Sequence, residues 1–152
     1  MSLRMKITIK GDEQVMRKLA VLRRAGDDNH KIMEEIGREA IDYFSKDAFA
    51  TKGRVFGAAW PDYNPAYKKW KEKHYAGRGM LQLTGTMQDG FFAVATKSSV
   101  TIDNHSAVYK YHQSTAARNK LPRRAMAGIN PAIKRMVRDK VSQDIDRRMR
   151  AA

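Results

Sequence analysis

Residues Gly53–Gly128 contain FGAAW (Phe56–Trp60), MLQLTGTM (Met80–Met87), YKYHQ (Tyr109–Gln113) and LPRRAMAG (Leu121–Gly128), in that order. Glycine and proline punctuate the start of this stretch, and helical periodicity fails there. The 52 residues before it and the 24 residues after it carry apolar side chains at helical spacing. We therefore expect the two flanks to pack as helical elements around the central stretch.

The composition indicates a folded globular protein. The chain has 152 residues, of which 42% are hydrophobic and 30% charged, and it contains no cysteine. This length suits one domain with one core, so we expect a single domain over residues 1–152. The lack of cysteine excludes disulfides, thiol nucleophiles and cysteine-based zinc sites, and it fits a reducing compartment. No apolar run approaches the roughly 20 residues of a membrane span, and the N-terminus lacks the apolar core of a signal peptide.

The chain is strongly basic, with a net charge of +14 and a pI near 10.2. A positive field attracts polyanions, and nucleic acid is the obvious candidate. A solvated basic surface and a surface that meets an acidic protein are the alternatives. Charge reports on association and not on fold. Alone, it does not decide between a polyanion partner, a solvated surface and an acidic protein partner.

The flanks give a strand, two helices and a terminal helix. MKITIK (Met5–Lys10) alternates apolar and polar residues as a half-buried strand does. Asp12 can cap a helix that ends at Gly26. A longer helix is predicted from about Asn29 to about Ala50. Its apolar positions recur at three- and four-residue steps: Ile32, Met33, Ile36, Ala40, Tyr43, Phe44 and Ala48. Asn130-Pro131 opens the terminal helix, which we expect to fray beyond about Asp144.

Two strands are predicted in the centre. FFAVAT (Phe91–Thr96) and VTIDN (Val100–Asn104) should form an antiparallel hairpin with Val100 and Ile102 on one face. Asn64-Pro65 should start a short helix, and Thr84 or Thr86 should cap a turn. The predicted fold class is α+β: a small antiparallel sheet packed against a long helix, with additional N- and C-terminal helices.

Aromatic and basic residues alternate in the helix after Asn64. Such alternation can indicate nucleic-acid binding, but we favour a helix whose Trp70 packs inward and whose lysines are solvated. Trp60 and Phe56 are expected to anchor their loop to the core. Candidate contacts to a polyanion are Lys68, Lys69, Lys71, Lys73, Arg118, Lys120, Arg123 and Arg124.

No pattern of residues indicates catalysis. His105 and His112 are seven residues apart, but no third metal ligand accompanies them. Ser106 lies outside any G-x-S-x-G pattern, and YAGRG (Tyr75–Gly79) lacks the spacing of a phosphate-binding loop. We expect no cofactor, no metal and no enzymatic activity, and we predict that neither histidine is catalytic.

The order of these segments resembles the phage virion morphogenesis, or tail-completion, family of long-tailed bacteriophages and prophages. Four motifs carry the resemblance: Phe56/Trp60, then Leu81/Thr84/Gly85/Met87, then Tyr109/His112/Gln113, then Leu121/Pro122/Arg124/Gly128. The opening ITIKG strand and the helix after it also look like related head–tail connector proteins. The chain departs from the family where Ser114-Thr115 follows Gln113, where Met87 replaces leucine, and where Ala125–Ala127 is less bulky.

The resemblance implies a non-enzymatic structural protein that acts in tail completion or head–tail joining. It implies a homo-oligomeric ring with DNA passing through it, partners such as the tail tube, terminator or connector, and a place in the virion or in the host bacterial cytoplasm during assembly. Trp60 would then fix the long loop, and Thr84-Gly85 would make a capped turn. His112-Gln113 would supply buried or interfacial hydrogen bonds. Pro122 and Arg124 would set an extended, charge-bearing loop. The alternative is a sequence-nonspecific DNA- or RNA-binding module that uses Lys68–Lys73, Arg118–Arg124 and the terminal helix.

Overall fold

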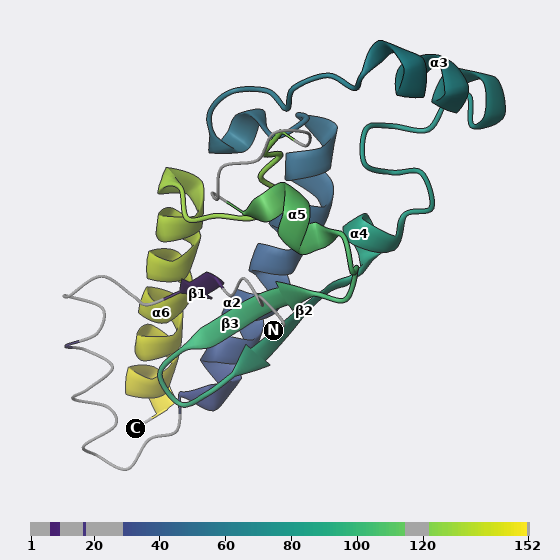
Figure 1. Ribbon diagram of the computed structural model, residues 1–152. Helices are drawn as coiled ribbons and strands as arrows, with labels where there is room; N and C mark the ends of the chain where they lie inside the picture. The colour runs from purple at the N-terminus through teal and green to yellow at the C-terminus, as the bar shows by residue number, and fades with distance from the viewer. Residues whose placement is uncertain (1–6, 10–16, 18–28, 115–121, 152) are drawn as a thin grey trace. The chain divides into compact units, whose positions relative to one another are not determined.

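The computed structural model describes residues 7–9, 17, 29–114 and 122–151 (Figure 1). The elements within them are β1 (Ile7–Ile9), α2 (His30–Tyr43), η1 (Phe44–Ala48), η2 (Arg54–Phe56), α3 (Pro65–His74), α4 (Thr86–Asp89), β2 (Phe91–Ala95), β3 (Val100–Asn104), α5 (Tyr109–Gln113) and α6 (Pro131–Ala151). The helix predicted from Asp12 to Gly26 lies outside the described residues except for Arg17.

The predicted α+β class is confirmed. The sheet has the order β1-β3-β2, and β1 pairs antiparallel with β3 so that Ile7 lies opposite Ile102. The predicted helix from Asn29 to Ala50 is also present: α2 passes into the π turn η1, and helical residues continue to Ala50.

The chain divides into two compact units. Unit 1 comprises residues 1–5, 42–91 and 104–128, and unit 2 comprises residues 6–41, 92–103 and 129–152. The long helix and both strands of the hairpin run through the boundary. That residues 1–152 form one domain stays a prediction.

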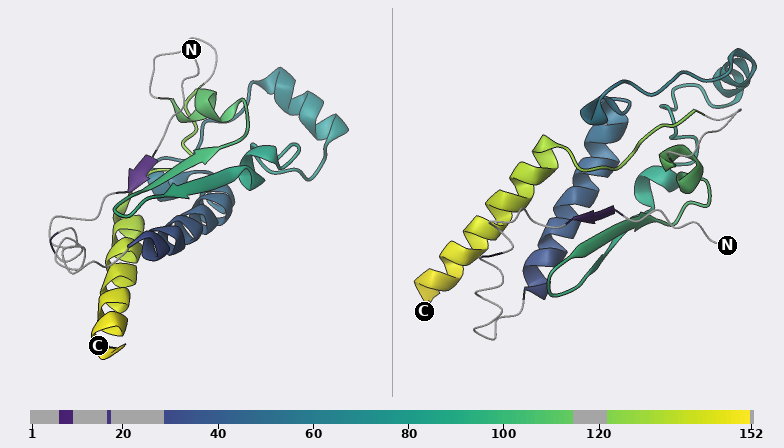
Figure 2. Two further views of the ribbon diagram at one scale, coloured as in Figure 1. Left: turned by 90° about the horizontal axis from the view of Figure 1, so that it is seen from below. Right: turned by 60° about the vertical axis from the view of Figure 1, so that its left-hand side comes forward.

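Unit 2 is built from the sheet, α2 and α6 (Figure 2). Alternation in β3 buries Val100 and Ile102 completely, as predicted. The apolar stripe of α2 is buried at Ile32, Met33, Ile36 and Ala40, and that of α6 at Ile133, Val137 and Val141. Lys140 of α6 forms an ion pair with Glu39 of α2 at 2.8 Å. The two helices and the hairpin therefore share one apolar core.

Gly37 of α2 lies in close contact with the hairpin. A Cβ atom at this position would lie 2.9 Å from Ala93 Cβ and 2.9 Å from Val100 Cγ2. We expect Gly37→Leu to lower the free energy of unfolding by about 1–3 kcal/mol, because the added atoms overpack this contact. Urea denaturation measures the change. Arg38→Leu, one residue on and exposed, is the matched control and should change stability by less than about 0.5 kcal/mol.

Unit 1 has an aromatic core. Phe44 is fully buried, with its ring centroid 5.9 Å from Phe56 and 5.9 Å from Phe91. Phe91 meets Tyr109 edge-on at 5.6 Å. Edge-to-face pairs at these distances are favourable beyond the burial of their area. The core of unit 1 therefore joins η1, η2, β2 and α5, which are far apart in the sequence.

Side-chain caps fix the starts of α3 and α6. Asn64 Oδ1 accepts a hydrogen bond from Ala66 N at 2.9 Å, and Asn130 Oδ1 accepts one from Ile133 N at 2.9 Å. A proline follows each asparagine at the first helical position, where its missing N–H costs nothing. Both helix starts confirm the predictions from Asn-Pro. Within the described part of the chain, no helix is long and apolar enough to cross a membrane.

Candidate interaction site

All ten motif residues that the sequence singled out lie in unit 1: Phe56, Trp60, Leu81, Thr84, Gly85, Tyr109, His112, Gln113, Pro122 and Arg124. They come from four separate stretches of chain. Three of them, Trp60, Gln113 and Arg124, make side-chain hydrogen bonds to backbone groups far away in the sequence or in another motif, so these three hold parts of unit 1 together.

Trp60 anchors the loop that follows η2. Its indole Nε1 donates to the carbonyl of Ala125 at 2.8 Å, and its ring meets Phe49 edge-on at 5.4 Å. Only 6% of the residue is exposed. Gly53 has a φ of +80°, and a Cβ there would collide with the indole. The turn at Gly53 is thus shaped to admit the tryptophan.

Gln113 binds the backbone of the last motif. Its amide Nε2 donates to Ala127 O at 2.6 Å, and its Oε1 accepts from Met126 N at 2.9 Å and from Ala127 N at 3.3 Å. The side chain is buried. Arg124 N also donates to His112 O at 2.9 Å. The YKYHQ and LPRRAMAG segments are therefore joined by three hydrogen bonds of the Gln113 side chain and one hydrogen bond between their backbones.

Arg124 does not lie in an exposed, charge-bearing loop, and this corrects the sequence prediction. The side chain is 2% exposed, with Nε donating to Pro61 O at 2.9 Å and Nη2 donating to Asp62 O at 3.0 Å. The guanidinium carbon lies 5.2 Å from the ring centroid of Tyr63. Burial lowers the pKa of Arg124, while Tyr63 and Asp62 oppose that shift. Because its hydrogen bonds point inward, Arg124 is removed from the set of candidate polyanion contacts.

Lys71 is also buried, so it too is removed from the candidate polyanion contacts. Its Nζ donates to the carbonyls of Arg78 at 3.1 Å and Gly79 at 2.6 Å, and it lies 5.0 Å from the Tyr63 ring centroid. Burial lowers the pKa of Lys71. The ammonium therefore fixes the chain that returns from α3, because three donors on one flexible stem suit a turn of carbonyls.

Trp70 faces outward, contrary to the prediction that it packs inward. It is 43% exposed, and it stacks between Tyr67 at 5.7 Å and His74 at 5.2 Å, with Tyr75 at 5.6 Å. Lys71 occupies the inward face of α3 instead. We call Tyr67, Trp70, His74 and Tyr75 the aromatic row; α3 presents it between two extended connections to the rest of unit 1 (Figure 1).

The turn before α4 is present, but the predicted cap at Thr84 or Thr86 is not: Gly85 is the N-cap of α4, and no side chain among the described residues caps that helix. Gly85 has a φ of +78°, and Thr84 Oγ1 accepts a weak hydrogen bond from Thr86 N at 3.4 Å. Asn104 Nδ2 donates to Met87 O at 2.7 Å, and its Oδ1 accepts from Ser106 N at 2.8 Å. The turn, the end of β3 and the segment leading to α5 are therefore held by one asparagine side chain.

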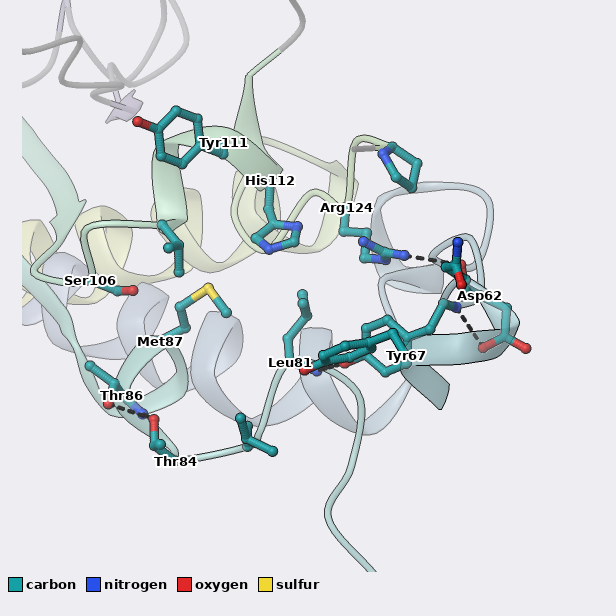
Figure 3. A pocket seen from close by; sticks show the side chains of 15 residues that line it. Asp62, Tyr67, Leu81, Thr84, Thr86, Met87, Ser106, Tyr111, His112 and Arg124 are labelled. Atoms are coloured by element: carbon teal, nitrogen blue, oxygen red, sulfur yellow. Dashed lines mark hydrogen bonds between the residues drawn. The ribbon is translucent and has the colours of Figure 1, made fainter. Parts of the chain in front are cut away.

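A hollow of about 520 Å³ opens beside these bonds in unit 1. We call it the apolar hollow. Its apolar lining is Tyr63, Tyr67, Leu81, Leu83, Met87, Val108, Tyr111 and Pro122, and its polar lining includes Asp62, Thr84, Thr86, Ser106, His112 and Arg124. Figure 3 shows His112 pointing from α5 toward Leu81 and Met87. The motif residues thus form one wall of a space large enough for side chains of another molecule.

The other candidate polyanion contacts are placed as follows. Lys69 and Lys73 are exposed on α3, and Lys68 forms an ion pair with Asp62 at 2.8 Å. This pairing lowers the pKa of Asp62 and raises that of Lys68. Arg123 is exposed and donates Nε to Gln113 O at 3.1 Å. Arg118 and Lys120 lie outside the described residues.

His105 and His112 do not belong to a group of potential metal ligands in the described part of the chain. His105 is exposed, whereas His112 is buried in the wall of the hollow. Among the residues that the structure describes, no group of three His, Asp or Glu side chains could hold a metal ion. That neither histidine is catalytic stays a prediction.

The model of the phage virion morphogenesis family matches residues 11–146. The chain belongs to this family. No curated protein and no solved structure matches the chain. The family is structural and non-enzymatic, so the protein is a phage protein with a role in building the virion and in contacting other virion proteins.

The sequence identified several motif residues that line the hollow, but the hollow itself was missed. The rest of its lining includes Tyr63, Tyr67, Val108 and Tyr111, which have no common spacing. One signal was present for Asn104: it follows Val100 and Ile102 at steps of two, so alternation places this polar residue on the buried face of β3. A buried asparagine at a strand end predicts hydrogen bonds to a neighbouring loop.

Arg124 allows a direct test of the internal role of the motif. We expect Arg124→Lys to lower the free energy of unfolding by about 2 kcal/mol, because a lysine cannot donate two bonds in the planar geometry of the guanidinium. Arg123→Lys is the matched control and should change it by less than about 0.5 kcal/mol. Urea denaturation of both variants gives the comparison, and equal small effects would contradict the assigned role.

Proposed function

We propose that the protein acts in tail completion or in head–tail joining, as a homo-oligomeric ring through which the phage DNA passes. The observation that supports this most is that the family motifs serve internal bonds in unit 1. Side chains that bind the protein's own backbone are not available for chemistry on a substrate, so this arrangement suits a protein that works through its surfaces. A ring of identical subunits is the commonest closed assembly that a repeated head-to-tail contact produces.

The exposed basic residues of α6 support contact with DNA. Its exposed basic residues are Lys134, Arg135, Arg138, Arg147 and Arg150. With a net charge of +14, a subunit that faces DNA would meet phosphates without reading bases. Such contacts let DNA move through a ring, because they do not depend on sequence.

Electron microscopy tests the position and the ring. Purified protein is mixed with tail tubes of the same phage, and native mass spectrometry gives the number of subunits. We expect closed rings at one end of the tube. A monomer that does not associate with tubes would contradict the proposal.

A titration with unrelated DNA duplexes tests the role of α6. We expect weak, sequence-independent binding that falls steeply with salt and falls further in Arg135→Glu/Arg138→Glu. Lys31→Glu/Lys97→Glu changes the charge equally at other exposed positions and should bind DNA better than the α6 variant. Strong discrimination between duplexes would instead favour a separate DNA-binding module, and no binding at low salt would remove DNA as a partner.

A further inference from the structure

Exposed apolar side chains gather on unit 1. Among the described residues, the large hydrophobic side chains with the greatest exposure are Tyr67, Trp70, Tyr75, Val94, Val108, Tyr111 and Ile129. Five of these seven lie in unit 1. Tyr67, Val108 and Tyr111 also line the apolar hollow, and Trp70 and Tyr75 continue from Tyr67 along α3. Patches of this kind on soluble proteins mark sites of contact with another molecule.

Four cationic side chains lie on the segments that carry this apolar surface. Lys69 and Lys73 are exposed beside the aromatic row, and Lys110 lies 5.1 Å from the ring centroid of Tyr111. Arg123 is exposed, and it follows Pro122, which lines the hollow. An apolar centre rich in tryptophan and tyrosine with a charged rim is the usual composition of a protein–protein contact. Because the side chains of this rim are positively charged, a partner with negative charge would complement them.

We propose that the apolar hollow and the aromatic row bind an acidic segment of another virion protein. Large apolar side chains of the segment enter the hollow between α5 and α4, and its carboxylates meet Lys69, Lys73, Lys110 and Arg123. This inference rests on family membership and on the surface of unit 1, and it does not require the ring.

The same surface is poorly suited to the two other occupants. A duplex offers phosphates but no apolar side chain for a hollow of about 520 Å³. A second copy of the chain carries 30 Lys and Arg against 16 Asp and Glu, so it is a poor source of the acidic segment that this rim would attract; the ring contact proposed above would use other surfaces.

Site-specific crosslinking tests the identity of the occupant. The photoreactive residue benzoylphenylalanine replaces Tyr111 at the hollow, or Val94 in unit 2 as the control, in cells that produce the complete virion. We expect irradiation to link position 111, and not position 94, to a virion protein through a peptide rich in Asp and Glu. A covalent dimer of this chain, a nuclease-sensitive adduct, a peptide without excess acid, or no preference over position 94 would overturn the proposal.

Binding of the linked peptide then tests the chemistry. Trp60 is buried and Trp70 is exposed, so the tryptophan emission should shift to the blue when the synthetic peptide covers α3, and Trp70→Phe should abolish the shift. We expect Lys69→Glu/Lys73→Glu to weaken binding about tenfold. Lys31→Glu/Lys97→Glu, with the same change in net charge, should bind within about twofold of the unchanged protein. Equal losses in both double variants would overturn a contact at α3.

Discussion

Gln113→Ala is expected to lower the free energy of unfolding by about 4 kcal/mol. The substitution leaves Ala127 O, Met126 N and Ala127 N without their partner in a buried site. Each unpaired buried group costs about 1–3 kcal/mol, and the missing side chain also leaves a cavity. Urea denaturation measures the loss. A change below about 1 kcal/mol would show that water or a rearranged backbone replaces the side chain.

Two further variants separate the hydrogen bonds of Gln113 from its volume. Gln113→Met keeps the length of the side chain but removes its amide, so it should lose most of the same free energy. Gln143→Ala removes an exposed amide from α6 and should change stability by less than about 0.5 kcal/mol. If Gln113→Met were as stable as the unchanged protein, packing and not hydrogen bonding would join the two motif segments.

Local signals in the sequence predicted local structure. The caps at Asn64 and Asn130 act within three residues of the asparagine, and the alternation that buries Val100 and Ile102 is complete within one strand. The fold class and the hairpin follow from such signals because each depends on neighbouring residues alone.

Long-range partners explain the predictions that failed. Arg124 and Lys71 were assigned to solvent because charged side chains are seldom buried without partners. Their partners are backbone carbonyls: Pro61 and Asp62 lie more than 60 residues from Arg124, and the Arg78–Gly79 turn folds back toward Lys71. Every residue has a carbonyl, so the sequence does not show which ones converge on a cation. Lys71 takes the inner face of α3, and Trp70, about 100° away around the helix, lies on its exposed side.

Removal of the two tryptophans is therefore expected to lower stability by very different amounts. Trp60→Ala should lower the free energy of unfolding by about 3–5 kcal/mol, because it deletes a buried ring that contacts Phe49 and a hydrogen bond to Ala125 O. Trp70→Ala should lower it by less than about 1 kcal/mol, because the ring is 43% exposed and stacks only on other side chains of the aromatic row.

Denaturation followed by circular dichroism gives both values without relying on tryptophan emission. Trp60→Phe is the intermediate case: it keeps most of the apolar ring but loses the indole N–H, so it should cost about 1–3 kcal/mol through the unpaired Ala125 carbonyl. A Trp70→Ala variant as unstable as Trp60→Ala would mean that the aromatic row supports the fold of unit 1. Stability retained in Trp70→Ala, together with lost binding of the acidic segment, would mean that the row is kept exposed for contact with a partner, because an exposed tryptophan adds little to the fold.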